Sequence, residues 1–182
     1  IIGHKARSLR KIIFMEKINF NIAVLIDGDN AQPKLLGAML EEVSKYGKAT
    51  IRRIYGDWTL PQMNGWKELI NQYSFSPVQK FAYTSGKNST DGALIIDAMD
   101  ILHSKNIDGF CIISSDSDYT GIAKRIREEG IFMMGIGQKK TPIAFVQSCE
   151  IFTFSENIFK DAPQVAEADR AEEVDEAAGG RA

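Results

Sequence analysis

Six of the aspartates stand where a parallel α/β sheet would gather them at one edge. They form three pairs along the chain: Asp27 and Asp29 in VLIDGDN, Asp91 and Asp97 in STDGALIID, and Asp116 and Asp118 in CIISSDSDY. The first and last pairs follow apolar runs typical of strands, and the middle pair opens a helical pattern. Carboxylates brought together without basic partners repel one another, and a divalent cation offsets that charge. The pattern therefore indicates metal-dependent chemistry.

Four of these carboxylates are expected to converge. Asp27 ends the first predicted strand, Asp116 closely follows the central one, and Asp118 opens the next helix. Strands end and helices begin at the same edge of a parallel sheet, which is where ligands bind. Asp91 starts a helix and shares the side of its apolar positions, so it also faces the sheet. We predict that these four residues are the catalytic and metal-binding groups.

The other two aspartates are supporting candidates. Asp97 lies six residues beyond Asp91, about 9 Å further along the helix and about 120° around it. It reaches the cluster only from the flank. Asp29 points either into the site or against the turn that it helps to form.

Hard oxygen ligands of this kind suit Mg²⁺ or Mn²⁺. Such a site can activate water for in-line attack on phosphorus. Asn30 either orients a water or caps a helix, and Ser114 either bonds a site carboxylate or simply ends a strand. Aspartates in DGDN and SSDSDY are also common in turns and helix caps. Three separate segments with acids at one edge favour the metal site.

A nucleic-acid substrate would need local positive charge, because the net charge of the chain is only −2. Lys87, in the loop TSGKNSTD, is placed to contact a phosphate or to balance Asp91. Arg52 with Arg53, and Lys139 with Lys140, are the pairs that could grip a backbone. Taken alone, each pair is more typical of solvated surface charge.

The supporting elements alternate between strand and helix. Strands are expected near 21–27, 48–56, 76–84, 108–115, 131–136 and 150–154, and helices near 32–46, 61–73, 89–105, 119–129 and 141–148. The run at 108–115 is apolar on both faces, as in a central parallel strand. This alternation predicts a doubly wound α/β domain, a three-layer α/β/α sandwich with a mainly parallel sheet.

The chain divides into three parts by composition. Residues 1–19 are predicted as an N-terminal extension, 20–160 as one domain, and 161–182 as an acidic disordered linker or tail with seven acids and two bases. A linker favours a further domain beyond it. Two distant cysteines and no membrane-length apolar run predict a cytoplasmic protein without a membrane partner. With only two histidines, a zinc site is not expected.

Three ordered segments closely resemble the NYN domain of the PIN-like nuclease superfamily: NIAVLIDGDNAQP, YTSGKNSTDGALIIDAMD and DGFCIISSDSDYTGIAKRIREEGIFMMGIG. The resemblance covers about residues 20–157. It implies a PIN-like (Rossmannoid) fold, metal-dependent ribonuclease activity and an acidic site of Asp27, Asp91, Asp116 and Asp118. Many bacterial relatives carry a LOTUS-type winged-helix module, also called OST-HTH, after such a linker. RNA is therefore the expected partner, with a homodimer or that module adding positive charge.

Three other functions fit parts of this sequence. The chain could be an RNA-binding or scaffolding module without turnover, although acids hinder simple binding of a polyanion. DGDN also resembles the DxD signature of haloacid-dehalogenase-type phosphatases, but Asn30 stands where that family has Thr or Val. A dinucleotide-binding Rossmann enzyme is disfavoured, since no GxGxxG follows the first strand.

Overall fold

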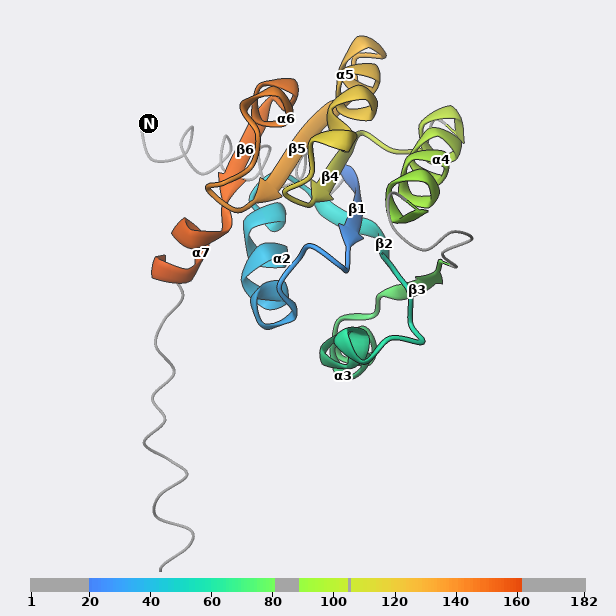
Figure 1. Ribbon diagram of the computed structural model, residues 1–182. Coiled ribbons are helices and arrows are strands. Elements are labelled where there is room, and N and C mark those ends of the chain that lie inside the picture. The colour runs from blue at the N-terminus through green and yellow to red at the C-terminus, as the bar shows by residue number, and fades with distance from the viewer. Residues whose placement is uncertain (1–19, 81–88, 105, 162–182) are drawn as a thin grey trace, which may run out of the picture.

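A six-stranded, wholly parallel sheet forms the centre of the molecule (Figure 1). The computed structural model describes residues 20–80, 89–104 and 106–161. The strands lie in the order β3-β2-β1-β4-β5-β6. Their bounds are β1 Asn21–Asp27, β2 Lys48–Gly56, β3 Ser76–Gln79, β4 Gly109–Ile113, β5 Phe132–Gly137 and β6 Ile151–Phe154. The predicted α/β class with a parallel sheet is confirmed.

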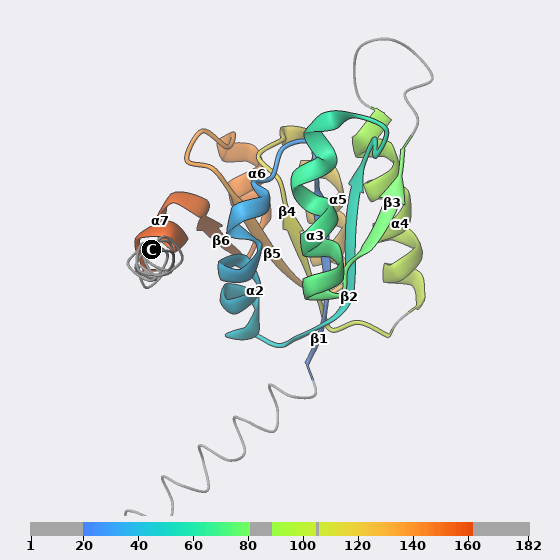
Figure 2. The same ribbon diagram turned by 90° about the horizontal axis from the view of Figure 1, so that it is seen from below.

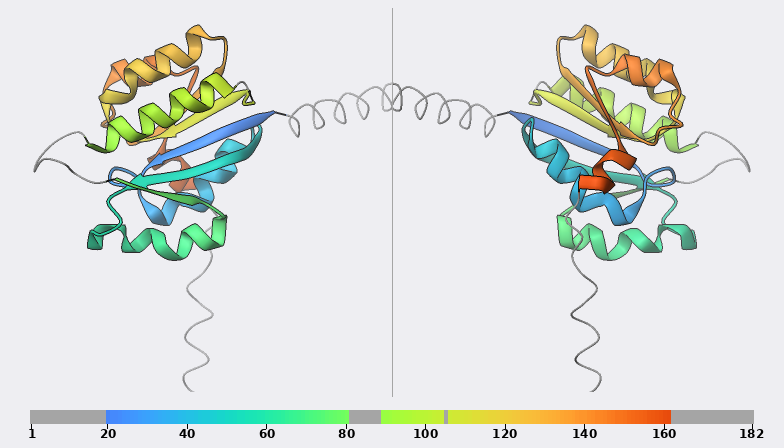
Figure 3. Two further views of the ribbon diagram at one scale, coloured as in Figure 1. Left: turned by 90° about the vertical axis from the view of Figure 1, so that its right-hand side faces the viewer. Right: turned by 90° about the vertical axis from the view of Figure 1, so that its left-hand side faces the viewer.

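Helices cover both faces of the sheet and complete three layers (Figure 3). One face packs on α4, α5 and α6, and the other on α2, α3 and α7. The bounds are α2 Leu36–Ser44, α3 Asn64–Tyr73, α4 Ser89–Ser104, α5 Thr120–Glu128, α6 Ile143–Ser148 and α7 Ser155–Asp161. Short 3-10 turns precede three of the helices: η1 Pro33–Leu35, η2 Pro61–Met63 and η3 Ser117–Tyr119.

The two central strands bury side chains on both faces. In β1, Ala23 and Leu25 join the core under α4 and α5, while Val24 and Ile26 join the core under α2 and α3. All five residues of β4 are buried as well. Alternation of side chains across a strand distributes these residues between two cores, so a continuous apolar run is required.

The strand order reverses between β1 and β4. The chain builds outward from β1 to β2 and β3, then returns to place β4 on the other side of β1 and builds outward again to β6 (Figure 2). Loops after these two strands therefore diverge and leave a crevice at the carboxyl edge. Ligands of open α/β sheets bind at such a point.

The helix α7 was missing from the expected elements. Its seven residues are too short to show a clear helical period, yet Ile158 is buried and α7 packs against α2. Predicted boundaries otherwise hold within a few residues. The predicted strand at 76–84 is found as β3, and residues 81–84 lie outside the described part of the chain.

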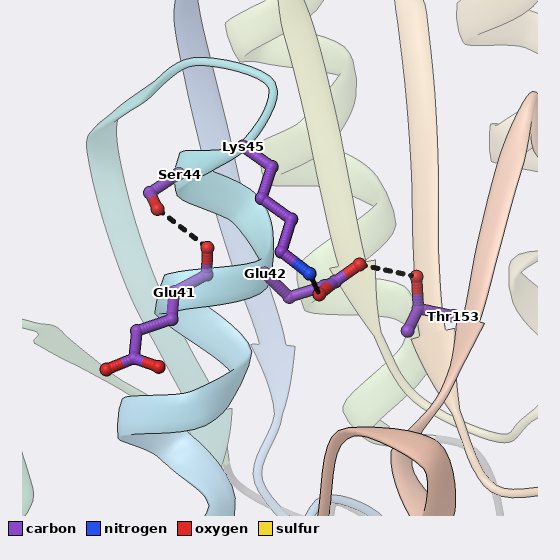
Figure 4. A network of polar contacts seen from close by, with 5 residues as sticks. All are labelled: Glu41, Glu42, Ser44, Lys45 and Thr153. Atoms are coloured by element: carbon purple, nitrogen blue, oxygen red, sulfur yellow. Dashed lines mark hydrogen bonds and ion pairs between the residues drawn. The ribbon is translucent and has the colours of Figure 1, made fainter. Parts of the chain in front are cut away.

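A polar contact ties α2 to the edge of the sheet (Figure 4). Glu42 accepts hydrogen bonds from Lys45 on its own helix end and from Thr153 Oγ1 of β6, the latter at 3.4 Å. Ser44 Oγ donates to the Glu41 carbonyl at 2.6 Å. These contacts join the last turn of α2 to the edge strand β6.

Both cysteines are buried and reduced, as expected of core residues. Burial raises the pKa of the Cys149 thiol to about 12, so it stays protonated at neutral pH. Within the described residues, no helix is long and apolar enough to cross a membrane.

Candidate active site

Asp27 lies at the end of β1 and is fully buried. Its Oδ2 accepts hydrogen bonds from Asn30 Nδ2 at 2.7 Å and Ser114 Oγ at 2.9 Å. Its other oxygen, Oδ1, is buried and accepts no hydrogen bond from the described residues. A buried carboxylate oxygen without donors is costly, so this atom marks a place where a positive group would be stabilised.

Burial raises the pKa of the Asp27 carboxyl above its ordinary value of 3.8. Hydrogen bonding by Asn30 and Ser114, and to a smaller extent by Tyr119, opposes that rise, whereas the negative charge of Asp29 adds to it. A nearby cation would lower the pKa again and keep the group ionised. The electrostatic state of Asp27 therefore depends on what binds beside it.

Ser114 joins the first strand to the fourth. Its main-chain N–H continues the ladder to the Ile136 carbonyl at 3.0 Å, so the residue extends β4. Its hydroxyl donates to Asp27 and accepts the main-chain N–H of Asp116 at 3.1 Å. The side chain thus couples the position of one acid to the backbone of another.

Asp116 and Asp118 belong to the turn that opens α5. Asp116 is the N-cap of η3, and its Oδ1 accepts the Asp118 N–H at 3.0 Å. Asp116 therefore caps the helix through Oδ1, and that cap leaves its other oxygen, Oδ2, unused. Asp116 is half-buried and Asp118 is exposed. Both lie at the carboxyl edge next to Ser114.

The loop after β1, on the other side of the crevice, begins with a tight turn. The Ala31 N–H donates to the Asp27 carbonyl at 2.9 Å, and the Gly28 N–H donates to the Tyr55 carbonyl at 2.8 Å. A Cβ at position 28 would lie 2.8 Å from that Tyr55 oxygen, so only glycine fits. The fully buried Trp66 donates from Nε1 to the Gly28 carbonyl at 3.1 Å. Core packing of Trp66 thereby fixes the DGDN turn.

Asp29 is exposed on the outer side of this turn. Its Oδ1 accepts a hydrogen bond from Gln62 Nε2 at 3.1 Å, from the segment before α3. The residue therefore braces the turn against η2, and it contributes its negative charge to the surroundings of Asp27.

Asp97 is held by two side chains of β2. It accepts hydrogen bonds from Arg53 and from the Tyr55 hydroxyl. Burial and the contact with Asp97 raise the pKa of Tyr55 strongly, so the phenol stays protonated. Asp97 therefore anchors α4 to β2, and it forms no group of three acids with the other described side chains.

The two arginines of β2 also have internal partners. Arg52 donates to the Ala49 carbonyl at 3.0 Å and to the Tyr73 carbonyl at 2.9 Å, and Arg53 pairs with Asp97. In register, Arg53 is opposite Leu25, two positions before Asp27. Neither arginine is brought to the acidic edge, so their expected substrate contact remains a prediction.

Two expected site residues are not placed. Asp91 belongs to the first turn of α4, but its side chain lies outside the described part of the structure, and so does Lys87. Among the side chains that are described, no three His, Cys, Asp or Glu residues form a group that could hold a metal ion. Asp27, Asp116 and Asp118 by themselves therefore do not make a complete site.

Sequence reasoning missed Lys80 at this edge. It is only 5% exposed and follows β3, where its main-chain N–H donates to the Gly56 carbonyl at 3.1 Å. A lysine inside the apolar run SPVQKFAYT was the available signal. Its burial places a positive charge at the same edge as the acids.

The carboxylate oxygens that the described residues offer are suitable ligands for a divalent cation. The orphaned Oδ1 of Asp27 is a hard oxygen without a donor, and Asp116 offers Oδ2 on the adjacent loop. Carboxylate oxygens suit Mg²⁺ and Mn²⁺. The roles of Asp91 and Asp118 as further metal ligands remain predictions.

The fold and these residues define a doubly wound α/β domain with carboxylates at its strand-order reversal. Residues 21–156 match the NYN domain, which covers most of the chain, and the protein belongs to that family. The family is generally one of nucleases of the PIN-like superfamily, and such nucleases usually use divalent metals.

The fold is also found in a solved structure. It is a protein of unknown function from Vibrio parahaemolyticus, with a TM-score of 0.62 and 15% sequence identity over 75% of this chain and 93% of its own. At that identity the likeness concerns the fold alone. No curated protein matches the chain.

Proposed function

We propose that this protein is a ribonuclease that hydrolyses RNA phosphodiester bonds with Mg²⁺ or Mn²⁺. The observation that carries the proposal is the buried Asp27 carboxylate, whose Oδ1 has no donor among the described residues, at the point where strand order reverses. Membership of a family of nucleases supplies the reaction class.

Asp27, Asp91, Asp116 and Asp118 would hold the metal. When bound, the metal would activate water and neutralise charge on the phosphate. Asn30 and Ser114 hold Oδ2 of Asp27, which leaves Oδ1 directed elsewhere. Ser114 also fixes the backbone of Asp116. The chain's own contribution is therefore to position acids that would otherwise repel one another.

The direct test incubates labelled single-stranded and structured RNAs with the wild type and with Asp116→Asn, in Mn²⁺, Mg²⁺ or EDTA. Asparagine can still cap η3, so the variant should fold. Cleavage by the wild type alone, and only with metal, is the expected result. Equal cleavage by both proteins would remove Asp116 from the site.

A second candidate is an RNA-binding or scaffolding module without turnover. RNA binding without cleavage in any metal would support it. A phosphatase of the DxD type would instead form an acid-stable aspartyl-phosphate on Asp27, which ³²P trapping detects.

A further inference from the structure

We infer that the RNA strand leaves the acidic site across β4 and β5, where Lys139 and Lys140 bind its phosphates. The two lysines belong to the loop between β5 and α6, residues 138–142. The inference rests on the proposed function for its substrate class. It adds a phosphate-binding loop and a direction for the bound strand.

The loop is joined directly to the acidic edge. The Gln138 N–H donates to Ser115 Oγ at 2.9 Å, and Ser115 lies between Ser114 and Asp116. Since β5 pairs with β4 in parallel register, the segments that follow both strands emerge side by side. A strand of RNA held at Asp116 would therefore meet this loop next.

Internal hydrogen bonds hold the loop in one shape. The Thr141 N–H and hydroxyl both donate to the Gln138 carbonyl, at 2.9 and 2.5 Å. The Lys139 N–H donates to both oxygens of Glu156, at 3.0 and 3.1 Å. Lys139 and Lys140 side chains are exposed. A braced loop presents its two charges at little entropic cost.

A small pocket lies between the loops after β1, β4 and β5, beside the acidic edge. Its volume of about 10 Å³ has room for about one water molecule. The polar residues that line it are uncharged: Asn30, Gln32, Ser114, Ser115, Gln138 and Ser155. A strand that passes over this pocket therefore meets hydroxyls and amides, which do not repel its phosphates.

Charge differs between the two directions away from Asp27. Toward β2, Asp29 is exposed, and Asp57 is held ionised by hydrogen bonds from Thr59 and Gln79 that lower its pKa. Toward β5, the exposed charges of the loop are two lysines. Glu156 is nearby and is also held ionised, because the hydrogen bonds from the Lys139 N–H lower its pKa, so it offsets one of the two lysine charges. A polyanion is therefore favoured on the β5 side.

A rival track runs along the outer part of β2. Lys48, Arg52 and Arg53 line an open polar groove there with Ser74 and Ser76. Arg53 is paired with Asp97, and Arg52 is bonded to two carbonyls. These arginines are partly satisfied by the protein itself, unlike a pair of lysines exposed on a loop.

The test measures the salt dependence of RNA binding by the full chain. Three proteins are compared by fluorescence anisotropy with a labelled single-stranded RNA in EDTA: Asp116→Asn, the same variant with Lys139→Gln and Lys140→Gln, and the same variant with Lys48→Gln and Lys124→Gln. The Asp116→Asn background prevents turnover. The last protein loses the same charge from two other exposed lysines, one at the start of β2 and one in α5.

Loss of two phosphate contacts should reduce the slope of log K against log salt by about 1.4. We expect that reduction for the Lys139 and Lys140 pair and an unchanged slope for the control pair. Equal slopes in all three proteins, a larger effect of the control pair, or no RNA binding by any protein would each overturn the inference.

The two proposals fail separately. RNA cleavage by the wild type with slopes unaffected by Lys139 and Lys140 would leave the ribonuclease proposal standing without this loop. RNA binding through the two lysines with no cleavage in Mn²⁺ or Mg²⁺ would retain the loop and remove the ribonuclease activity.

Discussion

Ser114 Oγ donates to Asp27 Oδ2 at 2.9 Å across the junction of β1 and β4. The two residues are 87 positions apart in the chain, yet the same hydroxyl also accepts the Asp116 N–H. One serine thereby sets the relative position of two acids on diverging loops.

Replacement of that serine should impair the site more than the fold. Ser114→Ala removes a donor that favours the Asp27 carboxylate, so the pKa of Asp27 should rise further. Loss of such a supporting hydrogen bond typically costs about 10–100-fold in activity or metal affinity. We expect RNA cleavage to fall by that range, with partial recovery at higher Mn²⁺. Ser44→Ala, which alters a serine at the far end of α2, is the control and should cleave normally.

Asp27→Asn should abolish cleavage and increase stability. The variant removes a buried charge with one unsatisfied oxygen, a relief of roughly 1–3 kcal/mol at neutral pH. A raised pKa means that the folded state binds a proton more readily than the unfolded chain. The wild type therefore loses stability as pH rises above 3.8 and through the folded pKa, so the advantage of the variant should grow over that window.

Urea unfolding at several pH values measures this difference. The comparison should be made in EDTA, because metal would lower the pKa of Asp27. A constant difference between the two proteins from pH 4 to pH 8 would contradict a raised Asp27 pKa.

Divalent metal should stabilise the wild type in the absence of RNA. Binding to the folded state alone adds about 2.7 kcal/mol when the metal is at 100 times its Kd, which corresponds to roughly 5–11 °C in Tm for a chain of this size. The bound cation would offset the negative charge of Asp27, whose Oδ1 has no donor among the described residues, and of the neighbouring acids. Differential scanning fluorimetry with Mn²⁺ and then EDTA checks it, with Asp27→Asn as the variant that should lose the shift.

Asp97 is expected to serve stability and not catalysis. Asp97→Ala removes the acceptor of Arg53 and of the Tyr55 hydroxyl, and it should cost about 1–3 kcal/mol, because the contact is only partly buried. Cleavage per folded molecule should stay within about twofold of the wild type, since both carboxylate oxygens of Asp97 are already engaged by Arg53 and Tyr55. Loss of cleavage in a fully folded Asp97→Ala protein would show that Asp97 is needed for catalysis.

Gly28→Ala should displace the DGDN turn. The new Cβ would lie 2.8 Å from the Tyr55 carbonyl oxygen and 2.8 Å from Met63 Cε, and the carbonyl cannot move without breaking the sheet. We expect at least a tenfold loss of cleavage and a cost of about 1–3 kcal/mol. Gly121→Ala is the matched control, because a Cβ there meets nothing within 4 Å.

Gly121 lies in α5, so its replacement by alanine should leave the free energy of unfolding unchanged or raise it by up to about 1 kcal/mol. Equal behaviour of the two variants would contradict the steric role of Gly28.

The sequence by itself determined the class of fold and the edge that carries the acids. Apolar runs such as those of β1 and β4 specify central strands, and the alternation with helices specifies parallel connections. Asp27 and Asp116 follow such runs, so their edge was predictable from local pattern. The short helix α7 was not, because seven residues show too little period and are held by contact with α2.

Only the tertiary structure decided which polar residues serve which purpose. Asp97 and Arg53 are 44 positions apart. In the sequence, each could equally contact a metal, a substrate or solvent. The packing of α4 on β2 pairs them with each other. Ser114 acquires its role only because β4 lies beside β1. Six aspartates satisfy the same local rules, but hydrogen bonds and burial depend on contacts that are distant in sequence. Those contacts separate Asp27, buried with one unsatisfied oxygen, from Asp29 and Asp97, which brace the fold.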